Sequence, residues 1–303
     1  MSELTSLEEK VIEQPDNIII PPPSDDTKYH RIQPFLHLSG KIPYVTNRAL
    51  LILNQKINID LISIWEQCEL VVCADGGTNR LYDYFTDEQS RMKCLPHYIV
   101  GDFDSLRPEV QAYYESRGCI VIPQSSQYSN DFMKCIYCIQ LHYQLKNTTW
   151  YEMLDTVNGL EELWNSIPHC SADITLYVLN AIGGRLDQTI QSINQMYILN
   201  KSDANLTLYF ITESDVIFLL KKGQNYVTYE NRSLFCDSGI PNCGLLPLGN
   251  GSVVLNSFGL KYDVREWTTQ MVGKVSSSNG ICGENGFIVE CSEDIVMNIE
   301  VTK

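Results

Sequence analysis

The chain has 303 residues, of which 44% are hydrophobic and 19% charged, and its formal net charge at pH 7 is -15. This length is enough for one large domain or two ordinary domains with hydrophobic cores, and we expect two. The acidic balance argues against nonspecific binding to nucleic acid or to an anionic membrane surface. No apolar stretch approaches the roughly 20 residues that cross a bilayer, so we expect no membrane-embedded part.

The N-terminal part, residues 1–33, is charged or rich in proline, with the stretch "IIIPPPSDD" in its middle. We expect a mobile arm there, with at most a short docked piece. The first residues, "MSELTSLEEK", lack the basic and apolar stretches of a secretory signal. The 11 cysteines are an odd number without a regular framework, which favours reduced thiols and a cytoplasmic protein. One C-x-x-C pair, Cys135 and Cys138, lies in a helical pattern and is interpreted as helix packing.

Residues 34–205 alternate short apolar runs with segments of helical pattern. The predicted strands are "ALLILN", "LVVCADGG", "HYIVGDFDSL", "CIVIP" and "ITLYVLNAIGG". A predicted helix follows each of them, and residues 146–172 look like an insertion with a short helix of its own. Repeated βα units of this kind predict an α/β domain, in which a parallel sheet is covered by helices on both faces to give three layers.

The pattern changes after residue 205, where short β-type runs are divided by glycine, asparagine and serine. These runs are "LTLYFI", "DVIFLL", "QNYVTY", "SVVLNSF", "MVGKVSS", "GFIVECS" and "IVMNIEV". They predict an all-β sandwich domain over residues 206–303.

Carboxylates follow four successive predicted strands of the α/β domain. They are Asp75, the pair Asp102 and Asp104, Asp131, and Asp187. Because the carboxyl ends of parallel strands meet at one edge of a sheet, we expect a shared site there. In "YIVGDFDSLR" the two acids are one residue apart and point to the same side of an extended chain, where their charges repel each other. A hard cation such as Mg²⁺ relieves this repulsion and joins carboxylates to substrate phosphates.

Two glycine pairs and an arginine in the same loops are suited to phosphate. The pairs Gly76-Gly77 and Gly183-Gly184 let backbone amides come close to phosphate oxygens. Arg185 offers a planar guanidinium fork. The chain has no G-x-x-x-x-G-K-[ST] loop and no G-x-G-x-x-G fingerprint, so the usual P-loop and dinucleotide interpretations lose support.

Six motifs stand in the order seen in one enzyme family. They are "ADGGTNRLYD", "GDFDSL", "QYSNDFMK", "NAIGGRLDQ", "GLLPLG" and "VSSSN". From about residue 48 to its end, the chain resembles the thiamine pyrophosphokinases, in particular the fungal ones. The resemblance implies transfer of the pyrophosphoryl group of ATP to the hydroxyl of thiamine, giving thiamine diphosphate and AMP. It also implies a catalytic α/β domain, a thiamine-binding β-sandwich, and a homodimer with the active site between the subunits.

The resemblance also assigns expected roles to individual residues. The expected Mg²⁺ ligands, direct or through water, are Asp75, Asp102, Asp104 and Asp131. The expected catalytic residues are Asp102, Asp104, Asp131 and Arg185, and the proton acceptor is either Asp131 or Asp102. The expected substrate-binding residues are Asp75, Gly76, Gly77, Asn79, Gln127, Lys134, Gly184, Asp187, Ser278 and Asn279. Tyr262 and Trp267 are candidates for an aromatic wall beside the cationic thiazolium ring, or for ordinary core aromatics.

The sequence departs from the family pattern at two positions near these residues. Asn130 stands where the family usually has threonine, and Gln188 stands where histidine often follows the aspartate.

Other functions are compatible with parts of this pattern. The D-x-D of Asp102 and Asp104 also occurs in phosphatases with an aspartate nucleophile, and in Mg²⁺-dependent transferases that use nucleotide sugars. The phosphatase interpretation leaves the acids at the other strand ends and the β domain unexplained, and turnover of a nucleotide sugar would test the transferase interpretation. A protein that only binds thiamine or a nucleotide would gain little from so much charge repulsion.

Overall fold

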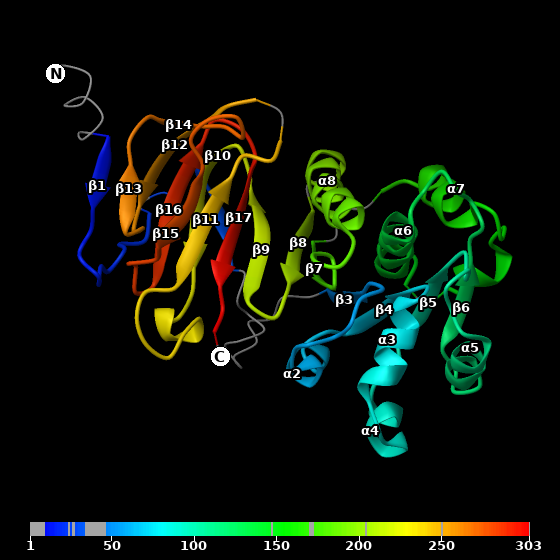
Figure 1. Cartoon of the computed structure of the whole chain (residues 1–303). Coiled ribbons are helices and arrows are strands. Elements are labelled where there is room, and N and C mark those ends of the chain that lie inside the picture. The colour runs from blue at the N-terminus through cyan, green and yellow to red at the C-terminus, as the bar shows by residue number, and fades with distance from the viewer. Residues whose placement is uncertain are drawn as a thin grey trace. The chain divides into compact units, whose positions relative to one another are not determined.

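The computed structural model describes residues 10–23, 25, 28–33, 47–146, 148–169, 173–203, 205–249 and 251–302. These residues form two compact units, both drawn in Figure 1. The first, here called the α/β unit, takes its members from Tyr44–Thr212. The second, here called the β unit, takes its members from Met1–Pro43 and Glu213–Lys303. The predicted domain start at residue 34 lies outside the described residues.

The α/β unit is built on strands that pair in parallel in the order β8-β7-β3-β4-β5-β6. Their bounds are β3 Arg48–Ile52, β4 Leu70–Ala74, β5 Tyr98–Gly101, β6 Ile120–Pro123, β7 Ile174–Leu179 and β8 Leu206–Ile211. Every residue of β3, β4 and β5 is buried, as expected for parallel strands that are covered on both faces.

Helices lie on both faces of this sheet (Figure 1). Their bounds are α2 Leu61–Trp65, α3 Gly77–Tyr84, α4 Glu88–Lys93, α5 Pro108–Glu115, α6 Asp131–Gln144, α7 Gly159–Ser166 and α8 Leu186–Ser202, with a short 3₁₀ helix, η2, at Trp150–Met153. The chain steps outward from β3 to β6 and then returns to β7 beside β3. Because parallel crossovers are right-handed, this reversal places α6 and α8 on the face opposite α3 and α5. The predicted three-layer α/β fold is confirmed.

The sequence before helix α6 explains why the helix begins at Asp131. Asn130 caps it, since its side-chain oxygen accepts a hydrogen bond of 2.9 Å from the backbone N–H of Met133. Cys135 and Cys138 are fully buried within the helix. Their interpretation as helix packing is therefore confirmed.

The β unit contains two larger sets of paired strands, which lie face to face (Figure 1). One is a five-stranded sheet in the order β14-β12-β16-β10-β2, and the other pairs β15, β11, β17 and β9 in that order. A further pair joins β1 to β13. The bounds are β1 Val11–Glu13, β2 Tyr29–Ile32, β9 Asp215–Leu220, β10 Gly223–Thr228, β11 Asn242–Leu246, β12 Val253–Phe258, β13 Tyr262–Val264, β14 Trp267–Thr269, β15 Ser276–Gly280, β16 Gly286–Cys291 and β17 Ile295–Glu300, with a 3₁₀ turn, η3, at Arg232–Leu234. The predicted β-rich C-terminal part is confirmed.

Strand pairing differs from the prediction at two places, after residue 205 and in the N-terminal arm. Strand β8, expected to open the β-sandwich, pairs in parallel with β7 over Leu206–Ile211. Part of the expected mobile arm is strand: β1 pairs with β13 and β2 with β10, and Ile20 between them is fully buried. Such segments carry the alternation of a strand, but the pattern does not say which partner they have.

One predicted strand is shifted within the β unit. The run "MVGKVSS" begins with a turn, and the strand β15 starts only at Ser276. In the described part of the chain, no helix is both long enough and apolar enough to cross a membrane.

Candidate active site

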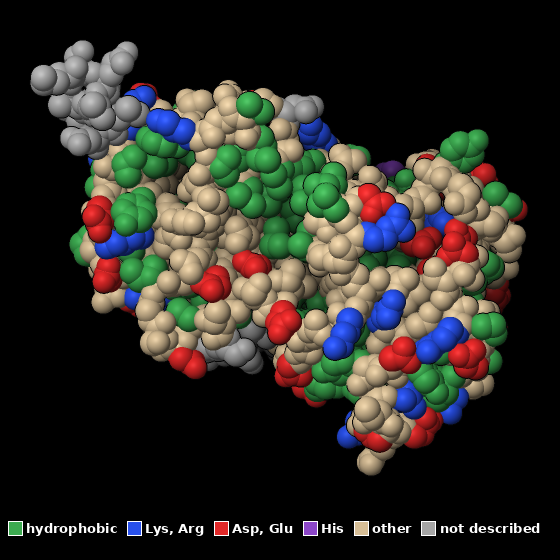
Figure 2. Space-filling model, viewed as in Figure 1, with side chains coloured by type: hydrophobic (Ala, Val, Ile, Leu, Met, Phe, Trp, Pro, Cys, Tyr) green, Lys and Arg blue, Asp and Glu red, His purple; other side chains and the backbone are tan. Residues whose placement is uncertain are grey.

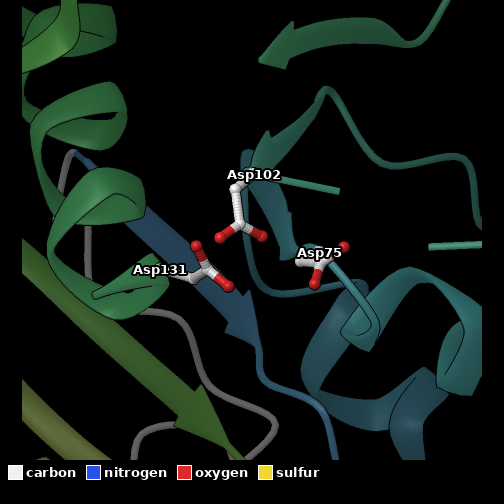
Figure 3. Close-up of side chains that lie close together, drawn as sticks. All are labelled: Asp75, Asp102 and Asp131. Atoms are coloured by element: carbon white, nitrogen blue, oxygen red, sulfur yellow. The ribbon is translucent and has the colours of Figure 1, made fainter. Parts of the chain in front are cut away.

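Three aspartates from separate segments of the α/β unit converge on one point. Asp75 directly follows β4, Asp102 directly follows β5, and Asp131 is the first residue of α6. One carboxylate oxygen of each lies within 4.8 Å of the others. Figure 3 shows the three side chains lying close together. We call Asp75, Asp102 and Asp131 the acid cluster.

The backbone around the cluster has unusual conformations that bring the carboxylates together. Asp75 has φ 37° and Phe103, between the two acids of the D-x-D, has φ 63°. Non-glycine residues rarely adopt such left-handed values unless the surroundings enforce them, and such residues gather at functional sites. Gly101 lies so close that an added Cβ would meet Asp75 Cβ at 2.7 Å. The Asp75 side chain can therefore lie against the end of β5 only because residue 101 has no side chain.

The electrostatics of the acid cluster reflect like charges that are held close together. Burial, and then the charge of Asp131, raise the pKa of Asp75 to about 6. Burial also raises the pKa of Asp131 despite the nearby Lys134. Burial acts to raise the pKa of Asp102 as well, but the hydrogen bonds from Gln127 and the backbone outweigh it, so that this pKa is lowered. The cluster thus carries more negative charge than its own hydrogen bonds offset.

One oxygen of the cluster has no hydrogen-bond donor among the described residues. Asp75 is only 4% exposed, and its Oδ1 is buried without a partner among the described residues. Its other oxygen accepts a bond of 3.3 Å from the backbone N–H of Ser105. Buried carboxylate oxygens are normally satisfied, and an unmatched one beside two further carboxylates fits a hard divalent cation. The acid cluster is therefore suited to hold Mg²⁺.

A buried lysine provides positive charge at the edge of the cluster. Lys134 is 4% exposed, and its Nζ donates a hydrogen bond of 3.0 Å to Asp131 Oδ1. The two residues lie three positions apart in α6, which brings their side chains onto one face of the helix. A buried ammonium ion requires such a partner, so Lys134 orients Asp131 and offsets part of the charge of the cluster.

A pocket lies within the β unit. Its volume is about 270 Å³, and its walls include Tyr262 in β13, Trp267 in β14 and residues 275–279 around β15. Leu245 of β11 and Leu255 of β12 contribute the apolar surface. In Figure 2, hydrophobic side chains gather on the face of the β unit that is drawn, and acidic and basic side chains are interspersed on the α/β unit.

Both halves of the chain match one family. The sequence profile described as "Thiamin pyrophosphokinase, catalytic domain" matches residues 61–208, and "Thiamin pyrophosphokinase, vitamin B1 binding domain" matches residues 235–296. The thiamine pyrophosphokinase of Saccharomyces cerevisiae is 40% identical over 275 residues, which are 84% of this chain and 86% of the relative. The chain belongs to the thiamine pyrophosphokinase family.

Solved structures agree with this family membership. The thiamin pyrophosphokinase from Candida albicans superposes with a TM-score of 0.90 at 58% identity, covering 97% of this chain and 98% of that one. The thiamine pyrophosphokinase from Bacillus subtilis superposes with a TM-score of 0.58 at 16% identity, covering 84% of this chain and 100% of that one. The second match shows a shared fold alone.

Some of the residues expected from the family resemblance lie outside the cluster. Asp104 is exposed and accepts a bond of 2.7 Å from the Ser105 hydroxyl. It is not part of the three-oxygen group found among the described residues, but it lies beside Asp75 and helps to raise the pKa of that carboxyl. Arg185 and Asp187 are both exposed and face each other, with Arg185 Nη2 2.5 Å from Asp187 Oδ2. The guanidinium fork of Arg185 is thus paired with its neighbour in this structure, and a phosphate group would have to replace that neighbour.

Other expected substrate residues instead hold parts of the site in place. Gln127 Nε2 donates a bond of 2.8 Å to Asp102 Oδ2, so this side chain orients a cluster carboxylate. Asn79 donates a bond of 2.7 Å to the Ser105 carbonyl and accepts one of 3.1 Å from the N–H of Arg107. Asn79 therefore ties α3 to the loop that follows β5.

The glycine pairs occupy turns with little free space. Gly77 begins α3, and an added Cβ there would lie 2.4 Å from the carbonyl oxygen of Ile52. Gly76 precedes it as the N-cap. The side chain of Gln55, a residue the sequence reasoning missed, donates a bond of 2.7 Å to the Gly183 carbonyl and lies against Gly184. No sequence motif indicates a role for Gln55, because its hydrogen-bond partner Gly183 lies 128 positions away in the chain.

The two residues that depart from the family pattern both lie at the start of a helix. Asn130 caps α6, and asparagine caps helices at least as well as the threonine expected from the resemblance. Gln188 is exposed in the first turn of α8.

In the β unit, the two expected thiamine residues differ in their freedom. Asn279 is buried, and its side chain accepts a bond of 2.9 Å from the N–H of Tyr262 and donates one of 2.9 Å to the carbonyl of the same residue. Asn279 thus fixes the wall of the pocket. Ser278 is exposed and lines the pocket with its neighbours.

Proposed function

We propose that the acid cluster of the α/β unit is the centre at which the pyrophosphoryl group of ATP passes to the hydroxyl of thiamine. The enzyme class follows from the family: the chain is a thiamine diphosphokinase, which forms thiamine diphosphate with ATP. The placement of the reaction rests on three converging carboxylates and the unpartnered buried oxygen of Asp75. An aspartyl phosphatase or a nucleotide-sugar transferase is not favoured, because neither belongs to this family.

In this proposal, each residue has a role in the bond making, bond breaking and proton transfer at the β-phosphorus of ATP. The thiamine oxygen forms a bond to the β-phosphorus, the bond from that phosphorus to the bridging oxygen breaks, and AMP leaves with the electron pair. Mg²⁺, when bound by Asp75, Asp102 and Asp131, would neutralise negative charge on the phosphates. Arg185 exchanges Asp187 for a phosphate oxygen, and Asp102 or Asp131 accepts the hydroxyl proton. Catalysis is then mainly positioning and electrostatic stabilisation.

The thiamine rings are proposed to lie in the pocket of the β unit. Its walls join two aromatic side chains, Tyr262 and Trp267, to the exposed hydroxyl of Ser278. An aromatic face attracts the positive charge of a thiazolium ring, and a hydroxyl suits the polar edge of a pyrimidine. The volume of about 270 Å³ is near the lower end of the range for ligand pockets.

The metal requirement is tested with purified protein, ATP and thiamine, by measuring AMP and thiamine diphosphate together. Turnover should stop in EDTA and return when Mg²⁺ or Mn²⁺ is added. Full turnover in metal-free buffer would overturn the metal assignment and leave the family assignment intact.

The resemblance further supports a homodimer in which each active site joins the α/β unit of one subunit to the β unit of the other. The test is complementation between Asp104→Ala and Ser278→Phe, each nearly inactive alone. In a mixed dimer, one site carries both defects and the other carries neither, so activity should reappear on subunit exchange. If exchange is verified and the mixture stays inactive, the site is completed within one chain.

A cytoplasmic location is proposed on the state of the thiols. Ten cysteines in the described residues are free, as is usual in a reducing compartment. Cell fractionation with the tagged full-length chain tests this, and recovery in an organelle or at a membrane would contradict it. The acidic net charge of -15 leads us to expect no partnership with nucleic acid or membranes.

A further inference from the structure

The N-terminal segment contributes to the pocket of the β unit. Strand β1 runs antiparallel to β13, with Val11 opposite Val264 and Glu13 opposite Tyr262. Val11 is one of the residues that line the pocket, together with Tyr262 and Trp267. Residues 10–33 lie outside both regions matched by the family profiles, 61–208 and 235–296. A pocket wall is therefore supplied by a part of the chain that neither family profile covers.

Bonds along the segment hold this wall in place on either side of Val11. The N–H of Arg265 donates to the carbonyl of Lys10 at 2.9 Å, and the N–H of Gln14 donates to the carbonyl of Lys261 at 2.9 Å. Lys261 Nζ lies 3.1 Å from Glu13 Oε1 and 2.9 Å from Asp16 Oδ1. Strand pairing on both sides of Val11 thus gives its side chain a defined position.

Further along, the same segment is anchored by a buried residue. Ile20 is fully buried, its N–H donates to Asn285 Oδ1 at 2.8 Å, and its carbonyl accepts from Asn285 Nδ2 at 2.9 Å. Ile18 donates a backbone bond of 3.0 Å to Cys282. The segment is therefore built into the β unit rather than laid over it.

We propose that Val11 is a substrate-binding residue, which makes the N-terminal segment part of the thiamine site. The proposal rests on the proposed function of the pocket as the thiamine site. An aliphatic side chain at this position offers an apolar contact to a ring held between Tyr262 and Trp267. It carries no charge, so it leaves the attraction between the aromatic walls and a cationic ring undisturbed.

The neighbour of Val11 provides a matched control. Successive side chains of a strand point to opposite faces, so Ile12 points away from the side that Val11 occupies. Ile12 is partly buried like Val11, and it is not among the described residues that line the pocket. Equal substitutions at the two positions disturb the strand to a similar degree, but only one of them alters the pocket.

The experiment compares Val11→Ala and Val11→Phe with Ile12→Ala and Ile12→Phe in the full-length chain. The readouts are the Kd of thiamine measured by calorimetry without ATP, the KM of thiamine and of ATP, and kcat. Val11→Ala should weaken thiamine binding about fivefold, which is about 1 kcal/mol. Val11→Phe should weaken it at least tenfold by filling the pocket, and kcat and the KM of ATP should change less than twofold. Both Ile12 variants should bind thiamine within twofold of the unchanged protein.

A fifth variant, Ser278→Phe, separates failure of this inference from failure of the proposed function. It places a bulky ring in the pocket without touching β1. If Ser278→Phe and both Val11 variants bind thiamine normally, the pocket is not the thiamine site. If Ser278→Phe loses binding while the Val11 variants keep it, the role of Val11 is refuted. Equal losses in the Val11 and Ile12 pairs would also refute it, since the segment would then act only through stability.

Discussion

Replacing Asp75 with asparagine should make the metal-free protein more stable at neutral pH and at the same time lower kcat at least about 100-fold. Asp75 is 4% exposed, and burial together with the charge of Asp131 raises its pKa from 3.8 to about 6. The pKa of the folded state is thus above that of the unfolded chain. Ionisation of this carboxyl therefore favours unfolding, and its cost to stability grows as the pH rises from about 4 to above 6. Asparagine keeps the shape, has no charge, and tolerates the φ of 37° at this position.

The size of the effect can be worked out from the shift. A rise of about two pKa units corresponds to about 3 kcal/mol between the two protonation states. Lys134 and the partial exposure of Asp102 and Asp131 relieve some of the repulsion in the folded protein. We therefore expect Asp75→Asn to raise the free energy of unfolding by about 1–2 kcal/mol at pH 8, and by about 0.5 kcal/mol or less at pH 4.

The assay is urea unfolding in EDTA at a series of pH values between 4 and 8, followed by circular dichroism. The control is Asp187→Asn, because Asp187 is exposed and its pKa is lowered by its hydrogen bond with Arg185. This control should not stabilise the protein at pH 8. In Mg²⁺, the kcat of Asp75→Asn should fall at least about 100-fold, which is about 2.7 kcal/mol of barrier. Added Mg²⁺ should stabilise the unchanged protein more than the variant, because a ligand of the folded state raises its stability.

Two outcomes would refute the reasoning. One is an Asp75→Asn protein that is less stable than the unchanged protein at pH 8 in EDTA. The other is a gain in stability of the same size at pH 4 and pH 8, which would mean that the effect does not come from the charge of Asp75.

Asp102→Asn and Asp104→Asn should each lower kcat at least about 100-fold while the far-ultraviolet spectrum stays unchanged; near-normal kcat in both would exclude the D-x-D from the metal site. Gly101→Ala should destabilise the protein by about 1–3 kcal/mol in thermal unfolding, because the new Cβ would meet Asp75 Cβ at 2.7 Å; an unchanged Tm would show that the backbone yields freely. Lys134→Met should cost about 3 kcal/mol of stability in EDTA, since Asp131 loses its buried partner, and Mg²⁺ should restore part of it; equal loss with and without metal would contradict this.

The sequence alone determined the strand ends at which the acid cluster lies. Apolar runs such as Tyr98–Gly101 alternate with helical patterns, and this alternation is sufficient to predict a parallel sheet. Because the strands of such a sheet present their carboxyl ends at one edge, the acids that follow them were expected to meet. Asp75, Asp102 and Asp131 do meet. This inference works because both the period of a strand and the direction of a βα unit are local properties of the chain.

Only the tertiary structure decided which polar side chains are free to bind a ligand and which already hydrogen-bond other parts of the protein. The motifs mark both Asn79 and Asn279 as ligand-binding candidates. In the structure, each side chain hydrogen-bonds backbone groups of another segment. Asp104 shares a motif with Asp102 but is not part of the three-oxygen group, although it still helps to raise the pKa of Asp75. Similarly, no local pattern pairs Val11 with Val264. Contacts between residues far apart in the chain depend on how whole segments pack. The hydrophobic periodicity of a single segment does not determine its packing partners.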